Sequence, residues 1–124
     1  MSRGLGDVYK RQIHMNEYAG RNQSGPQAFY REGCPAGRLL AGAIQDAMNE
    51  KLSPKKTRTA LGGDYYILTL GVPSVLVECG FLSNPREEAR LLDPAYQQKI
   101  GQAIADGLEA YEVLLARTGQ EDAA

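Results

Sequence analysis

The sequence contains one histidine and two cysteines in 124 residues, and these low numbers limit the chemistry that the chain can carry. Two cysteines, Cys34 and Cys79, do not make a disulfide framework. A catalytic thiol needs a neighbouring base, and His14 is the one imidazole in the sequence, so a cysteine enzyme is disfavoured. No apolar run approaches the ~20 residues that a membrane-spanning helix needs.

The chain also lacks a strong excess of charge of either sign. Its formal net charge is −1, which predicts neither a nucleic-acid-binding surface nor a polybasic patch for membranes. Hydrophobic residues make up 43% of the chain, which is enough for a packed core, and charged residues make up 23%, which is ordinary for a globular protein. The length allows at most one domain.

Residues 1–12, MSRGLGDVYKRQ, have no apolar segment of the kind found in signal peptides. They resemble adapter-derived leaders of environmental gene fragments, and we exclude them from the fold. We expect the domain to span residues 13–115. The polar residues 116–124 are expected to form a disordered tail.

The rest of the chain alternates between strand and helix patterns, which predicts an α/β layered domain. Residues 36–52 have apolar side chains at four-residue intervals, as in an amphipathic helix. Asn84-Pro85 and Asp93-Pro94 are typical helix starts, and the second begins a long helix. Strands are expected at residues 12–16, 27–31, 65–70 and 75–79.

Glu78 follows an apolar run at the point where that predicted strand would stop, and Gly80 would then let the chain turn. In open α/β sheets, ligands bind at the carboxyl ends of the strands. Glu78 is therefore a candidate acid or base, although a glutamate in this position is more often a solvated loop residue. Taken alone, His14 can be a metal ligand, a surface residue or a packed residue.

Lys55, Lys56 and Arg58 lie in a polar connection after the first helix. These three cations can face solvent or contact a substrate. We favour the solvated reading, because charge runs of this kind usually lie on exposed loops.

Four segments resemble one known family. Residues 73–92, PSVLVECGFLSNPREEARLL, and the following YQQKIGQAIADGLEAY are similar to the C-terminal part of zinc-dependent N-acetylmuramoyl-L-alanine amidases of the family 3 type. Ile13–Asn16 resembles the S-I-H-x-N segment of that family, with Gln12 in place of the usual serine. GPQAFY resembles its G-x-Q-x-F-Y strand, and DYYIL its D-Y-x-V-L segment. The four matches follow the order of the family over residues 13–112.

The resemblance implies a mixed β-sheet with helices on both faces and an N-terminally truncated domain. It implies that Glu78 is the catalytic carboxylate, that His14 is a Zn²⁺ ligand, and that Asn16 helps to shape the substrate site. The remaining zinc ligands would lie upstream of this chain. We therefore expect this fragment to be inactive alone, since one histidine cannot complete a zinc site.

The implied substrate is peptidoglycan, cleaved between the muramoyl group and the L-alanine of the stem peptide. Such an enzyme would act outside the cytoplasm, in the periplasm or cell wall. A degenerate, non-catalytic domain that binds peptidoglycan or regulates an active partner stays open as the alternative. The upstream sequence would discriminate between them, because the active enzyme needs the remaining ligands.

Overall fold

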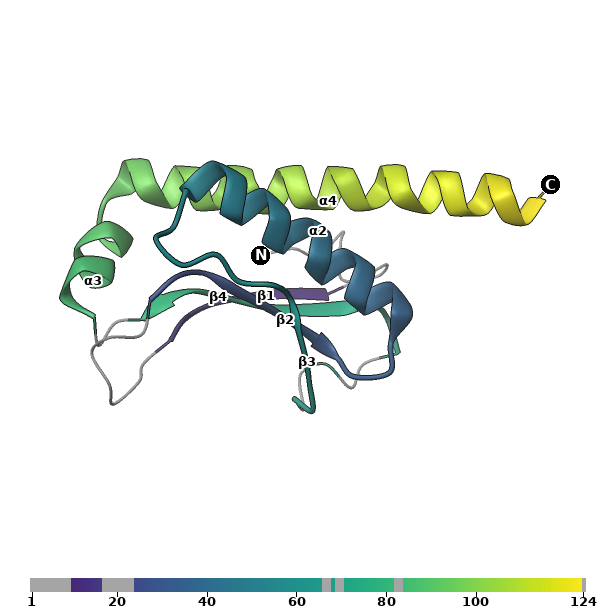
Figure 1. Cartoon of the computed structure of the whole chain (residues 1–124), viewed down its shortest axis with the longest axis horizontal. Helices are drawn as coiled ribbons and strands as arrows, with labels where there is room; N and C mark the ends of the chain where they lie inside the picture. Colours follow the sequence, from purple (N-terminus) through teal and green to yellow (C-terminus); the bar gives the residue numbers. More distant parts are fainter. Residues whose placement is uncertain (1–9, 17–23, 66–67, 69–70, 82–83, 124) are drawn as a thin grey trace.

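The structure, a computed structural model, describes residues 10–16, 24–65, 68, 71–81 and 84–123, with only the backbone described for residues 10–16 and 118–123. Four strands form one sheet in the order β1-β4-β2-β3. Two long helices cover this sheet and a short helix closes one end (Figure 1). This arrangement confirms the predicted α/β fold with a mixed sheet.

The central strand, β4 (Ser74–Phe81), is buried at every position because it has a neighbour on each side and helices over one face. β1 (Lys10–Asn16) pairs with it in parallel, and β2 (Gln27–Arg31) pairs with it in antiparallel. β3 (Leu61–Gly63) runs parallel to β2 at the edge of the sheet. The strands predicted at residues 12–16, 27–31 and 75–79 are therefore present.

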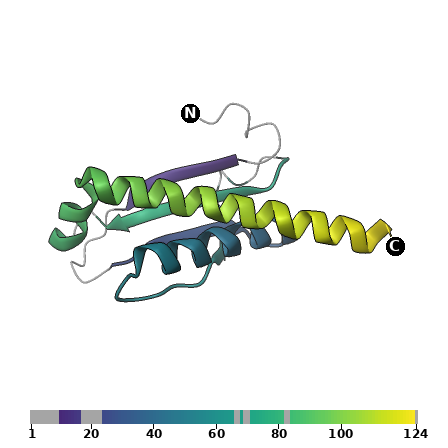
Figure 2. The ribbon, with the colours of Figure 1, turned by 90° about the horizontal axis from the view of Figure 1, so that it is seen from above.

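The helices α2 (Pro35–Leu52) and α4 (Pro94–Ala123) both lie on the same face of the sheet, and Figure 2 shows α4 running lengthwise over it. The resemblance implied helices on both faces; among the described residues the two long helices share one. The hydrophobic core lies between sheet and helices, and its larger members are Leu40, Ile44, Met48, Val75, Val77, Cys79, Ile100, Ile104, Leu108 and Tyr111.

Local sequence signals set where the helices begin. Cys34 is the N-cap of α2, and its Sγ accepts a hydrogen bond of 3.4 Å from the N–H of Gly37. Asn84 caps α3 (Pro85–Leu91) by accepting hydrogen bonds from the first turn. Asp93 precedes α4, and its Oδ1 accepts a bond of 3.0 Å from the N–H of Ala95. The starts predicted at Asn84 and Asp93 are confirmed.

Two predicted details of packing and strand position are wrong. The apolar spacing of residues 36–52 predicts that both Leu39 and Leu40 are buried. Leu40 is buried, but Leu39 is 45% exposed, because a helix turns by about 100° per residue. The strand after that helix is β3, not the later aromatic run. Tyr65 lies outside any strand, Leu68 lies in a short turn, and residues 66–67 and 69–70 lie outside the described residues.

The two ends of the domain also differ from expectation. β1 begins at Lys10, inside the segment that we set aside as a leader, and residues 10–12 pair with residues 74–76. At the other end α4 continues to Ala123, where a disordered tail was expected. The last residues contain no proline, and the helix continues through Gly119, which disfavours a helix less strongly than proline does. Among the described helices, none is both long and apolar enough to cross a membrane.

Candidate active site

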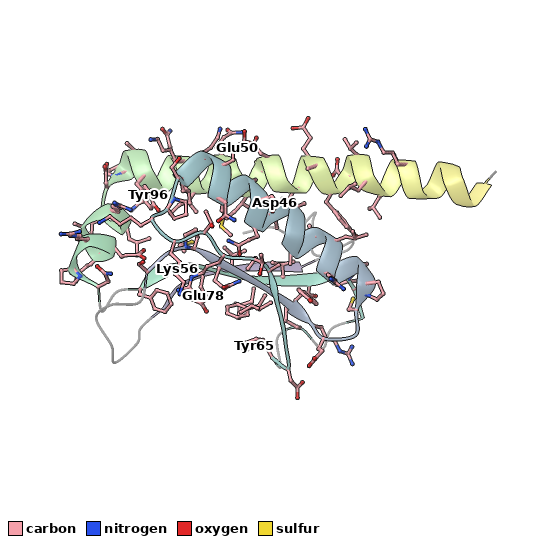
Figure 3. All side chains as sticks on the ribbon, in the orientation of Figure 1. Asp46, Glu50, Lys56, Tyr65, Glu78 and Tyr96 are labelled. Carbon is pink, nitrogen blue, oxygen red and sulfur yellow. The ribbon has the colours of Figure 1, made fainter. Side chains whose placement is uncertain are left out.

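Glu78 lies inside β4 and not at its end, because the strand continues through Gly80 to Phe81. Alternation along the strand sends Cys79 into the core beneath the helices and Glu78 to the opposite face. Figure 3 shows Glu78 on the face away from α2 and α4. Its side chain is nevertheless buried, with 7% of the residue surface exposed. The expectation of a turn at Gly80 is therefore wrong.

The backbone of His14 lies directly beside that of Glu78, because the two residues are register partners in the parallel pair of β1 and β4. Neighbouring strands lie about 4.8 Å apart. The register shifts between His14 and Asn16, so that Asn16 is the partner of Phe81. The fold thus brings together the two residues that the sequence proposed as zinc ligand and base, and Asn16 lies opposite the end of β4.

Gln27 is the register partner of Glu78 on the other side, in β2. It is 3% exposed, and its Nε2 donates hydrogen bonds to the carbonyl oxygens of Thr59 at 2.7 Å and Ala28 at 3.0 Å. Glu78 therefore lies between His14 and Gln27 across three adjacent strands. Sequence reasoning noted Gln27 only as part of a family segment.

Gln45 of α2 supports this part of β2. Its Oε1 accepts a 2.7 Å hydrogen bond from the N–H of Ala28, and its Nε2 donates to the carbonyl of Pro26 at 3.1 Å. β3 pairs only with Phe29–Arg31 of β2, and the side chain of Gln45 provides hydrogen bonds to the backbone just before that paired segment. A polar residue on the buried stripe of an amphipathic helix was the available signal, and it was missed.

Cys79 does not act as a nucleophile in this environment. Burial in the core, together with the neighbouring charge of Glu78, raises the pKa of its thiol from 9.0 to about 12. The thiolate, which is the reactive form, is therefore scarce at neutral pH. Cys34 and Cys79 are both free cysteines, in agreement with the absence of a disulfide framework.

Glu87 and Arg58 hold the segment before β2 against the end of β4. Glu87 is 6% exposed, and its Oε1 accepts a hydrogen bond from the N–H of Gly25. The Nε and Nη2 of Arg58 donate to the carbonyl of Ser24 at 3.1 and 2.8 Å. The guanidinium of Arg58 also lies 5.7 Å from the ring centroid of Phe81. We name Glu87, Arg58 and the backbone of residues 24–25 the loop clamp.

The loop clamp changes the interpretation of two residues. Arg58 was expected to be a solvated loop cation and is instead half-buried and hydrogen-bonded. Burial raises the pKa of Glu87 above its ordinary value of 4.5, against the hydrogen bond from Gly25 and the charge of Arg90, which lower it. A Cβ at Gly80 would collide with the Glu87 carboxylate, so any larger residue there would have to displace that carboxylate.

A complete zinc site is not formed by the part of the chain that the structure describes. No three His, Cys, Asp or Glu residues gather there in a way that would hold a metal ion. Structural and catalytic zinc sites use three or four protein ligands. His14 and Glu78 alone therefore do not fit a whole coordination shell.

A protein-family model described as N-acetylmuramoyl-L-alanine amidase matches residues 11–110. The chain belongs to this amidase family. That match covers β1 through most of α4, and the family is generally zinc-dependent.

Similar proteins agree with the family. The chain is 36% identical over 101 residues to the germination-specific N-acetylmuramoyl-L-alanine amidase of Bacillus subtilis, covering 80% of this chain and 42% of that protein. It is 33% identical over 107 residues to the probable cell wall amidase LytH of Staphylococcus aureus, covering 86% and 35%. The chain thus spans less than half the length of these curated relatives.

Among solved structures, the CwlD amidase from Clostridioides difficile, determined in complex with the GerS lipoprotein, has a TM-score of 0.82 and 33% identity. The likeness covers 86% of this chain and 55% of CwlD. An N-acetylmuramoyl-L-alanine amidase from Clostridium difficile 630 has a TM-score of 0.77 at 27% identity, over 83% of this chain and 56% of the other. This chain therefore has the fold of an amidase catalytic domain, and it corresponds to about half the length of each of these two solved amidases.

Proposed function

We propose that this chain carries part of the active site of a peptidoglycan hydrolase that cleaves the amide bond between N-acetylmuramic acid and L-alanine. The pairing of His14 with Glu78 in neighbouring strands is the observation that carries this proposal. This pairing supports a site in which His14 as a metal ligand and Glu78 as a carboxylate lie close enough to act on the same amide bond of the substrate. Membership of the amidase family supports the reaction class.

In this proposal Glu78 is the general base. It takes a proton from the attacking water and passes one to the departing amine, which is the usual work of a carboxylate in amide hydrolysis. Its buried position on a central strand favours the role, because a rigid, partly desolvated carboxylate is held in one place while the substrate binds.

His14 is proposed as one zinc ligand, and Asn16 as a contact that shapes the substrate site. The described residues do not supply the other ligands, so the metal site would need residues beyond them. Peptidoglycan lies outside the cytoplasmic membrane, and the proposed enzyme acts there. One B. subtilis relative and LytH are named as amidases, and the latter as a cell wall amidase, which supports this location.

A second candidate function is a non-catalytic domain that binds peptidoglycan or regulates an active amidase. Both functions are compatible with the lack of a three-residue ligand cluster among the described residues. The two functions differ in one property, since a binding domain would keep its affinity for peptidoglycan when Glu78 is replaced and would never release stem peptide.

The test uses the chain and a chimera in which residues 13–112 replace the matching segment of the B. subtilis germination-specific amidase, which is 36% identical over 101 residues. Release of stem peptide from purified peptidoglycan and zinc content are measured together. Glu78→Gln should lower hydrolysis by about 10²–10⁴-fold and keep zinc near the parent level, because glutamine keeps the size of the side chain but cannot take the proton.

His14→Ala should lose both zinc and activity, because a ligand is removed. Glu88→Gln is the matched control for Glu78→Gln, since Glu88 is an exposed glutamate of α3. Loss of zinc in Glu78→Gln with retention in His14→Ala would reverse the two roles. Full activity in both variants would overturn the proposed site.

A further inference from the structure

A pocket of about 500 Å³ lies beyond the carboxyl end of β4, apart from the residues placed in the active site. Its walls come from residues 24–26 before β2, residues 54–55 after α2, and residues 84–87 at the start of α3, with Arg90 and Tyr96. Figure 3 shows Tyr96 at the same end of the molecule as α3. The established family match assigns no role to this pocket.

The lining of the pocket is positively charged. Lys55, Arg86 and Arg90 contribute three cations, and all three are exposed. Arg90 also makes a side-chain hydrogen bond with Tyr96. Glu87 is the carboxylate among the described lining residues, and its Oε1 already accepts the N–H of Gly25. A guanidinium binds a carboxylate through two parallel hydrogen bonds, so this lining favours an oxyanion.

Part of the pocket wall is backbone with restricted conformation. Three of the lining residues, Pro26, Pro54 and Pro85, have a backbone φ fixed by their rings. The loop clamp holds the backbone of residues 24–25 from both sides through Glu87 and Arg58. A rigid site loses little conformational entropy on binding, which favours a functional pocket over a chance depression.

The pocket lies within reach of a substrate bound at Glu78. Gly80 lies two residues beyond Glu78 in β4, and a Cβ placed on it would meet the carboxylate of Glu87, which lines the pocket. Two strand residues span roughly 7 Å, about the length of two residues of an extended peptide. In peptidoglycan the second residue of the stem is D-glutamate or its amide, joined onward through its γ-carboxyl, so that the D-glutamate form has a free α-carboxylate.

We propose that this pocket binds the free carboxylate of the stem peptide next to the bond that is cleaved. The inference rests on the proposed function for its substrate. Lys55 and Arg86 would provide the charge that selects an acidic stem over an amidated one. Arg90 would provide a third cation, and Tyr96 the wall beside it.

The experiment is a calorimetric titration of the 124-residue chain with two soluble tripeptides at neutral pH. One is L-Ala-γ-D-Glu-L-Lys, and the other carries D-isoglutamine in the second position, so that one carboxylate becomes an amide. We expect the acidic tripeptide to bind about 3- to 10-fold more tightly than the amidated one. The double substitution Lys55→Gln/Arg86→Gln should remove this preference.

The matched control is Lys99→Gln/Arg117→Gln, which removes the same charge from exposed positions of α4 outside the pocket. It should change the affinity by less than about 2-fold, since long-range effects of exposed charges are screened. An equal loss in both double variants, or equal affinity for the two tripeptides, would overturn the proposal. Inorganic phosphate is titrated as a further probe. If phosphate binds as tightly as the acidic tripeptide and also depends on Lys55 and Arg86, the pocket is a general anion site and the proposal is overturned.

Hydrolysis of whole peptidoglycan by the chimera is measured separately from tripeptide binding. The proposed hydrolase function and the proposed carboxylate pocket therefore fail in different ways. Charge-dependent tripeptide binding with no hydrolysis in any form supports the pocket and contradicts the hydrolase. Hydrolysis without charge-dependent binding contradicts the pocket alone.

Discussion

Glu87 of α3 accepts a hydrogen bond from the backbone N–H of Gly25, and this bond joins two segments 62 residues apart. It ties the loop before β2 to the helix that follows β4. Gly25 has a positive φ of 93°, a conformation in which a side chain is strained, so glycine suits this contact. This part of the loop clamp therefore depends on the backbone of Gly25 and on the buried carboxyl group of Glu87.

Replacing Glu87 should have effects that depend on the substitute and on pH. Glu87→Ala should lower the free energy of unfolding by about 1–3 kcal/mol, because the buried N–H of Gly25 loses its acceptor. Glu87→Gln keeps an acceptor oxygen. Both are measured by urea denaturation across a range of pH.

The sign of the pH effect follows from the raised pKa of Glu87. The stability gained from its protonated form is fully present below pH 4.5 and is lost as pH rises through the raised pKa. Glu87→Gln stays neutral, so its stability relative to the parent chain should increase from pH 4.5 towards pH 7. Glu88→Gln, exposed in the same helix, should show no such increase, and equal behaviour of the two variants would contradict the assignment.

Two glycines of α4 should respond to alanine with opposite signs. A Cβ at Gly107 would lie 2.5 Å from the Cα of Ile44 and 3.0 Å from its backbone nitrogen, so Gly107→Ala forces α2 and α4 apart. We expect a loss of about 1–3 kcal/mol in stability, as for other overpacked cores. Gly101→Ala meets no atom within 4 Å and should stabilise the chain by roughly 0.5–1 kcal/mol. Thermal or urea unfolding that ranks the two in the reverse order would contradict the close crossing of the helices.

The two cysteines should differ in their reaction with a thiol reagent. Cys34 is partly exposed, whereas Cys79 is buried and has a pKa of about 12. Under native conditions at pH 8, one thiol should react quickly with Ellman's reagent and the second only after denaturation. Cys34→Ser, which keeps Cys79 alone, should abolish the fast phase, and a fast phase that remains would show that Cys79 is accessible.

Gln45 should be costly to replace by an apolar residue of similar size. Gln45→Leu leaves the N–H of Ala28 and the carbonyl of Pro26 without their side-chain partners. We expect a loss of about 2–4 kcal/mol, since each buried polar group left unsatisfied costs roughly 1–3 kcal/mol. Gln98→Leu on the exposed side of α4 is the control and should change stability by less than about 0.5 kcal/mol. Hydrogen exchange at Ala28 would report the same loss locally.

Local patterns in the sequence predicted most of the secondary structure. The stripe of Tyr96, Ile100, Ile104, Leu108 and Tyr111 predicts the last helix. Tyr96 is half-buried in the structure, and the other four residues are buried. Asn84 and Pro85 predicted the start of α3. These elements are predictable because their signals lie within a few residues, in hydrophobic spacing and capping chemistry.

Features that depend on distant partners were missed. The residues of β3, Leu61-Gly62-Gly63, have little strand propensity, and they form a strand through pairing with Phe29–Arg31. Glu87 looked like an ordinary acidic residue in a first helical turn, and its partner Gly25 lies in another part of the chain. The nearness of His14 to Glu78 followed from a family resemblance and not from any spacing in the sequence, because a parallel register is fixed only by the folded sheet.

The position of β4 in the sheet has a consequence for the order in which the protein can form during synthesis. β1 and β2 each pair with β4, which comes later in the chain than both. Before residues 74–81 leave the ribosome, the described strands can form only the short pairing of β2 with β3, and an isolated two-stranded pair is marginal in water. Until the central strand arrives, β1 and β2 therefore lack the pairing that β4 gives them. Exposed apolar surface and unpaired strand edges make such an incomplete state prone to association with other chains.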